Sequence, residues 1–146
     1  MAAYRAPVSE MRFVINELAD FESVRALAGD DDLSGELVDA ILDEADKFAS
    51  GVLAPLNVVG DREGCVLENG VVRTPTGFRE AYGQFVDGGW NGIHFAAEHG
   101  GQGLPRLVST AVSEMWTSAN MAFGLCPLLT QAAADALARH GSAALK

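Results

Sequence analysis

Residues 37–53 read LVDAILDEADKFASGVL and form the clearest helical pattern in the chain. Apolar side chains recur three and four positions apart, so they share one face, while carboxylates occupy the opposite face. The preceding run Asp30–Asp32 places negative charge at the positive end of the helix dipole, and we expect the helix to begin just after it. Pro55 is expected to end this helix, because the residue before a proline avoids the α region.

Four more helical segments are expected on both sides of this one. Apolar spacing predicts three helices over residues 9–18, 76–87 and 105–120, which begin at Ser9, Thr76 and Pro105. A break is expected at residues 124–127. The last helix is expected over residues 128–140 and ends at Gly141 in the C′ position. The sequence Val66-Leu67-Glu68-Asn69-Gly70-Val71-Val72-Arg73 predicts a hairpin, since Asn-Gly tolerates the positive φ angles of a type I′ turn. The expected fold is an all-α domain of about five helices with one small β-hairpin.

The charge balance bears on the partners of the chain. Ten basic and twenty acidic residues give the 146-residue chain a formal net charge of −10, which disfavours nucleic acid and anionic membranes as partners. Most of this charge lies in the first half, because residues 1–73 carry 6 basic and 15 acidic groups and residues 74–146 carry 4 and 5. The second half is therefore the one we expect another domain or subunit to cover.

The distribution of apolar residues and cysteines suggests a location. No uninterrupted apolar run approaches the roughly 18 residues of a membrane span, and the first residues do not follow the pattern of a secretory signal. We therefore expect a cytoplasmic protein. Cys65 and Cys126 belong to no CxxC pair and are expected to be two free, buried thiols.

Residues 98–105, EHGGQGLP, raise the question of a phosphate-binding loop, because closely spaced glycines let backbone N–H groups approach an anion. Pro105 removes a donor at the helix start, Glu98 adds negative charge, and neither nucleotide-binding glycine pattern is present. A structural turn is the favoured interpretation.

His94, Glu98 and His99 resemble a metal triad at first sight. Their order matches neither helical zinc motif, and the glycines that follow argue against a helix that would hold the ligands. We expect loop histidines and no metal site. Serines 109, 113 and 118 lie within a helical segment without a GxSxG motif, so nucleophilic catalysis has no support.

A series of short landmarks is more informative than any single motif. In chain order they are YRAP (4–7), MRFVINEL (11–18), LAPLNVVGDREGC (53–65), VRTPTGFREAY (72–82), GGWNGI (88–93), GGQGLP (100–105), SANMAF (118–123) and ALARHGS (136–142). Together they resemble the N-terminal helical domain of acyl-CoA dehydrogenases. The set is most similar to the long bacterial subgroup that includes the methylmercaptopropionyl-CoA dehydrogenases, and it covers essentially all of residues 1–146.

This resemblance implies an FAD-dependent α,β-dehydrogenation of an acyl-CoA thioester. Family members place the N-terminal domain against a middle β domain and a C-terminal helical bundle, and homo-oligomers are common. The bundle normally supplies the glutamate that removes the α proton, and the flavin contacts come mostly from the other two domains. The resemblance therefore implies no catalytic residue in this chain, gives no cofactor-binding residue, and assigns neither Glu98 nor Glu114 as the base. The 146-residue chain alone is expected to be inactive.

The resemblance also implies substrate-binding residues when this sequence is aligned to the family at Pro127. The positions that line the far end of the acyl cavity in relatives then fall at Trp116, Ala119 and Phe123, with Leu125 adjacent. The alternative is that Trp116 and Phe123 are ordinary core aromatics. The alternative for the whole chain is a helical protein-interaction module without flavin chemistry.

Overall fold

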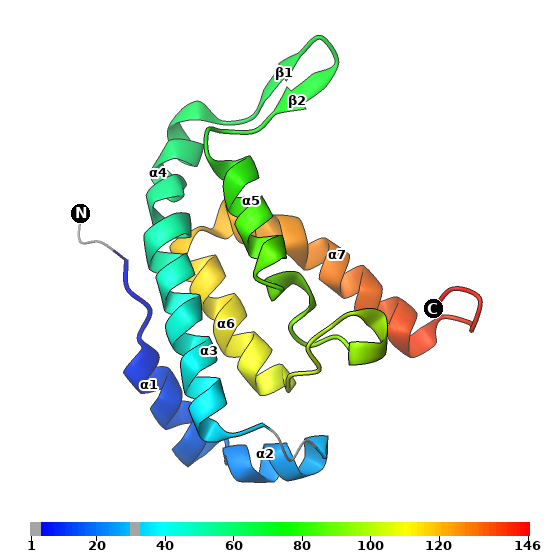
Figure 1. Cartoon of the computed structure of the whole chain (residues 1–146). Helices are drawn as coiled ribbons and strands as arrows, with labels where there is room; N and C mark the ends of the chain where they lie inside the picture. Colours follow the sequence, from blue (N-terminus) through cyan, green and yellow to red (C-terminus); the bar gives the residue numbers. More distant parts are fainter. Residues whose placement is uncertain (1–3, 30–32) are drawn as a thin grey trace.

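The computed structural model describes residues 4–29 and 33–146, which form helices and one short hairpin (Figure 1). In chain order the main elements are α1 (Val8–Phe13), α2 (Phe21–Ala28), α3 (Gly35–Phe48), α4 (Ala54–Glu63), β1 (Val66–Glu68), β2 (Val71–Arg73), α5 (Phe78–Asp87), α6 (Arg106–Ala119) and α7 (Met121–His140). Two π-helical segments, η1 (Val14–Leu18) and η2 (Ala49–Leu53), continue α1 and join α3 to α4. Two single 3-10 turns, η3 (Trp90–Gly92) and η4 (Ala97–His99), lie between α5 and α6. The predicted all-α fold with one hairpin is confirmed.

The predicted end of the central helix at Pro55 is wrong. α3, η2 and α4 form one long rod, and Pro55 is the second residue of α4 (Figure 1). The N–H of Ala54 donates to the carbonyl of Ala49, five residues earlier, as in a π-helix. We attribute the continuity to this wider turn, because it relieves the clash between a proline ring and the preceding turn that otherwise breaks a helix.

The predicted break at residues 124–127 is also wrong, because the chain turns at Asn120 instead. Asn120 has an extended backbone (φ −158°, ψ 91°), and its side chain caps α7. Pro127 then lies inside α7 and is buried, so its packing offsets the missing backbone hydrogen bond. α7 does end at His140, although Gly141 is extended (φ −67°) and not left-handed.

Two helices begin differently from the prediction. Ser9 lies within α1, whose N-cap is Pro7, and its hydroxyl contacts a neighbouring carboxylate instead of capping the helix. Gly77 precedes α5 with a left-handed backbone (φ 84°), and no side chain caps this helix. The expected cap, Thr76, is one residue too early to serve it.

The first third of the chain contains a helix that the sequence patterns missed. α2 begins at Asp20, whose carboxylate accepts the N–H of Ser23, and Phe21 is its buried residue. Residues Asp30–Asp32 lie outside the described residues. Ser34 is the observed cap of α3, since its hydroxyl accepts the N–H of Leu37 at 3.1 Å. With α1–η1 and α3–η2–α4 each counted as one, the described residues form six helical rods, and α2 is the one beyond the expected five.

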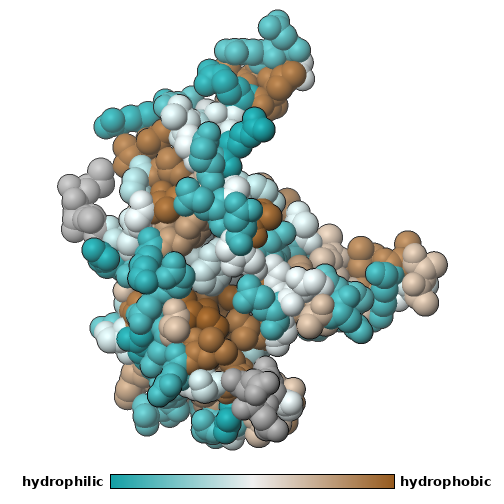
Figure 2. All heavy atoms as spheres, viewed as in Figure 1, coloured by the Kyte–Doolittle hydropathy of each residue, from teal (hydrophilic) through white to brown (hydrophobic). Residues whose placement is uncertain are grey.

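The hairpin forms as predicted. β1 and β2 pair antiparallel with Val66 opposite Arg73, and Asn69 and Gly70 have φ angles of 51° and 77°, as a type I′ turn requires. Leu67, Val71 and Val72 are exposed, and Figure 2 shows apolar residues on the surface of this projecting hairpin. The hairpin therefore adds little to the core.

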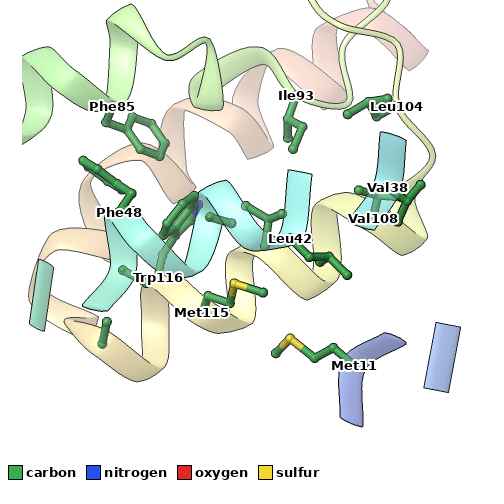
Figure 3. Close-up of a cluster of buried hydrophobic side chains, with 14 of the residues drawn as sticks. Met11, Val38, Leu42, Phe48, Phe85, Ile93, Leu104, Val108, Met115 and Trp116 are labelled. Atoms are coloured by element: carbon green, nitrogen blue, oxygen red, sulfur yellow. The ribbon is translucent and has the colours of Figure 1, made fainter. Parts of the chain in front are cut away.

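The core lies between the long rod, α5, α6 and the start of α7. Figure 3 shows Phe48 of α3, Phe85 of α5 and Trp116 of α6 gathered at one end of it. Val38 and Val108 lie at the other end, and Leu42 lies between the two groups. The predicted helix over residues 105–120 is observed as α6, and its buried face includes Val108, Val112, Met115, Trp116 and Ala119.

α7 leaves much of its apolar surface uncovered. Met121, Leu125, Leu128, Leu129 and Leu137 are all exposed. Within the described part of the chain, α7 is the helix that is long and apolar enough to cross a membrane by length and composition, and 11% of its most apolar stretch is buried. Length and composition do not separate a membrane span from a face that other protein covers.

Candidate functional site

An apolar pocket of about 540 Å³ opens between α4, α5 and the first turns of α7. Its lining residues are Gly60, Gly64, Cys65, Thr74, Pro75, Phe78, Arg79, Tyr82, Ala122, Phe123 and Cys126. Only Arg79 among them carries a charge. We refer to this hollow as the α7 pocket. Its composition suits an apolar ligand group such as an acyl chain.

Phe123 joins the core to the wall of the α7 pocket. Its ring centroid lies 5.6 Å from that of Phe85, edge to face, and 6.4 Å from that of Phe48, inside the core. On the pocket side it lies 6.5 Å from Phe78 and 6.4 Å from Tyr82. One face of this side chain is therefore fixed by core packing while another borders the pocket.

The wall opposite α7 depends on a close approach of two helices. A Cβ atom at Gly60 of α4 would lie 2.8 Å from Cζ of Phe78 on α5. A side chain at this position would have to displace the ring, so glycine permits the close approach. Gly60 thus lets Phe78 pack against α4 and border the pocket.

The predicted substrate-binding residues lie in three different environments. Phe123 lines the α7 pocket. Trp116 and Ala119 are buried within the core, where Trp116 packs edge to face on Phe48 at 5.2 Å, and neither lines the pocket. Leu125 is 54% exposed on the outer surface of α7. The structure therefore brings Phe123, Trp116 and Ala119 into one packed region and leaves Leu125 on the surface.

Several lining residues were missed in the sequence. Ala122 and Cys126 flank Phe123 on α7, and Phe78 and Tyr82 lie one turn apart on α5. The i, i+4 spacing of Phe78 and Tyr82 was visible, but it predicts any buried face equally well. What distinguishes a pocket from a core is the gap between helices, which spacing does not contain.

The prediction of two buried thiols is wrong, because both cysteines are exposed. Both are free, as expected, and both line the α7 pocket. Cys126 falls in the expected break at residues 124–127, but it lies on the pocket side of α7. Cys65 follows the end of α4, where the chain leaves the core for the hairpin.

The glycine loop is a structural turn, as predicted. The N–H groups of Gly100, Gly101, Gln102 and Gly103 all donate to backbone carbonyls of residues 92–97. Gly101 packs so closely on Phe95 that a Cβ atom would overlap the carbonyl of Phe95. Since its donors are already used, this loop cannot cradle a phosphate.

His94 is a loop histidine, as predicted, and it is buried beside α7. Its Nε2 lies 3.5 Å from Oδ1 of Asp135 without a hydrogen-bond partner in the described structure, and Asp135 is paired with Arg106. Burial, and then the positive charge of Arg106, lower the pKa of His94, while the hydrogen bond from Arg106 lowers the pKa of Asp135. No group of three or more potential metal ligands occurs in residues 4–29 and 33–146. The cluster ties the loop before α6 to the middle of α7.

Comparison with known proteins agrees with this architecture. The family model "Acyl-CoA dehydrogenase, N-terminal domain" matches residues 36–146. The chain belongs to this family. It is also 46% identical over 143 residues to a 3-methylmercaptopropionyl-CoA dehydrogenase of Ruegeria pomeroyi. That alignment covers 98% of this chain and 24% of the relative, so the chain spans about a quarter of the relative's length.

Neither the glycine loop nor the α7 pocket offers a group of free polar donors. The glycine-loop amides are used within the loop, and the wall of the α7 pocket has one charged side chain, Arg79. Glu98 and Glu114 are exposed and do not line the α7 pocket. The α7 pocket has room and apolar walls for an apolar ligand group.

Proposed function

We propose that this chain is the N-terminal domain of an FAD-dependent acyl-CoA dehydrogenase that catalyses α,β-dehydrogenation of an acyl-CoA thioester. In this proposal the chain contributes part of the acyl pocket. Membership in the acyl-CoA dehydrogenase family supports the reaction class. The single observation that carries the pocket role is that Phe123 borders an apolar hollow of about 540 Å³.

The residues of this chain suit binding of the acyl group more than binding of FAD. The α7 pocket presents aromatic and small side chains, which favour an acyl chain by burial of apolar surface. FAD and the catalytic base are proposed to be held by other domains, so this chain alone is inactive. Phe123 would limit the acyl length directly. Trp116 and Ala119 would support it from the core, and Leu125 would meet the acyl group or a neighbouring domain from the surface of α7.

The exposed surface of α7 fits the same proposal. A row of uncovered leucines is costly in water and suits a helix that another domain or a second copy covers. We therefore propose that the complete enzyme is a cytoplasmic homo-oligomer with the acyl-CoA substrate as its small-molecule partner. Nucleic acid and membranes are not proposed as partners.

The test compares two equally buried phenylalanines in a complete dehydrogenase that carries this chain. Phe123→Ala enlarges the proposed acyl wall, whereas Phe21→Ala removes a ring of α2 that does not line the pocket; both side chains belong to residues that are 3% exposed. Leucine variants at both positions provide milder changes in case alanine prevents folding.

We expect the Phe123 variants to raise kcat/KM for octanoyl-CoA relative to butanoyl-CoA by about tenfold, the scale of one pocket-filling group. The Phe21 variants should lower stability and leave this ratio unchanged. An unchanged ratio in the Phe123 variants, with only reduced stability, would show that Phe123 is a core residue and that the pocket role is wrong.

A further inference from the structure

Asn120 is the single residue between α6 and α7, and its side chain is enclosed. The residue is 1% exposed although it carries a polar amide. Its backbone N–H donates to the carbonyl of Trp116 at 2.9 Å, and its own carbonyl accepts the N–H of Gly124 at 3.1 Å. The backbone of Asn120 thus completes the end of α6 and the start of α7.

The side chain of Asn120 makes two further hydrogen bonds in opposite senses. Oδ1 accepts the N–H of Phe123 at 3.0 Å, and Nδ2 donates to the carbonyl of Leu53 at 3.2 Å. An N–H needs an acceptor and a carbonyl needs a donor, so the amide has one orientation that satisfies both. Asparagine is the residue whose short side chain offers both groups.

The partner in the long rod is equally enclosed. Leu53 is 0% exposed and is the last residue of η2, directly before the helix that contains Pro55. At this depth water does not compete for the hydrogen bond that Nδ2 of Asn120 donates. The bond therefore joins the irregular turn of the rod to the α6–α7 junction, across 67 positions of sequence.

The first turns of α7 carry one wall of the α7 pocket. Ala122, Phe123 and Cys126 all lie within six residues of Asn120, while Gly60 lies seven residues after Leu53 on the opposite wall. The side chain of Asn120 thus links the segment just before the α7 wall to the segment just before the α4 wall. A shift of α7 relative to the rod would change the width of the pocket.

We propose that Asn120 is a positioning residue that holds the start of α7 against η2 and thereby fixes the pocket wall and the acyl length that fits. The effect on acyl length rests on the proposed function. Asn120 does not line the pocket, so it acts through Phe123 and its neighbours.

The experiment uses a complete dehydrogenase that carries this chain with Asn120→Ser and Asn120→Ala. Serine retains an N-cap oxygen for α7 but is too short to reach Leu53 as well, whereas alanine removes both bonds. Ser34→Ala is the matched control, because it removes the cap of α3 at the far end of the rod from η2. All variants are measured under conditions where circular dichroism shows them folded.

The first measurement is the ratio of kcat/KM for octanoyl-CoA to that for butanoyl-CoA. We expect both Asn120 variants to change this ratio by about fivefold or more and Ser34→Ala to leave it within about twofold. If Phe123→Leu changes the ratio but neither Asn120 variant does, Asn120 is not a positioning residue. If Phe123→Leu does not change it either, the proposed acyl role has failed, and the second measurement decides on Asn120.

The second measurement does not depend on the reaction. Peptide mass spectrometry follows the alkylation of Cys126 and Cys65 by iodoacetamide, since both thiols are exposed in this chain and line the pocket. A displaced start of α7 should change the rate at Cys126 relative to Cys65 by about threefold or more. An unchanged rate ratio in both Asn120 variants would overturn the positioning role.

Discussion

Gly60 offers a test of the close packing between α4 and α5. In a helix, Gly→Ala normally stabilises a protein by about 1 kcal/mol, because alanine loses less backbone entropy on folding. At Gly83 of α5 a Cβ atom would meet nothing within 4 Å, so we expect the full gain from Gly83→Ala. At Gly60 the same atom would lie 2.8 Å from Cζ and 3.1 Å from Cε2 of Phe78.

These distances set the expected difference in stability between the Gly60→Ala and Gly83→Ala variants. Displacing a packed ring costs about 1–3 kcal/mol, so Gly60→Ala should be destabilising by up to about 2 kcal/mol despite its better helix propensity. The two alanine variants should therefore differ by about 1–3 kcal/mol in the free energy of unfolding. In a Phe78→Leu background the clash is removed, and Gly60→Ala should become stabilising.

Urea denaturation of the four variants and the wild type measures these values. The interaction energy between positions 60 and 78 comes from the double-mutant cycle. If Gly60→Ala stabilises the chain as much as Gly83→Ala does, and the cycle shows no coupling, then Phe78 does not pack on Gly60 and the pocket wall is incorrectly described.

Two further predictions concern the surface of α7 and the buried histidine. Leu128→Glu together with Leu129→Glu should reduce self-association of the chain in sedimentation velocity, because both side chains are exposed and apolar; a strictly monomeric wild type would contradict this. Because the pKa of folded His94 is lowered, the unfolded state binds more protons below about pH 6.5. Stability should therefore fall as pH decreases from about 7 to 5, by at most about 1.4 kcal/mol per pH unit. His94→Gln should flatten this dependence in urea titrations, and equal slopes in both proteins would refute it.

The local patterns predicted the elements that depend on local interactions. The apolar face of residues 37–53, the face of α6 and the Asn69-Gly70 turn are all observed. Each depends on periodicity or on the allowed φ angles of one dipeptide, and neighbouring residues determine both. α2 was missed because it is only eight residues long, and it buries Phe21 as its one core residue.

At two prolines, tertiary packing outweighs the local preference for a helix end. Pro55 and Pro127 both predict helix ends, yet both lie inside helices. A π-turn accommodates Pro55, and burial of Pro127 offsets its missing backbone hydrogen bond. Both effects depend on packing partners elsewhere in the chain. The cysteines were misplaced for the same reason, since exposure depends on the gap between α4, α5 and α7.

The sequence by itself determined the helical class, the hairpin and, through its collinear landmarks, the family. These follow from spacing along the chain and from residue types that can be seen one position after another. Only the tertiary structure decided that Phe123 borders a pocket while Trp116 and Ala119 lie behind it, and that Asn120 bonds to Leu53. The physical reason is that a pocket wall and a buried hydrogen bond each require atoms from segments far apart in the chain, and those distances exist only once the helices have packed.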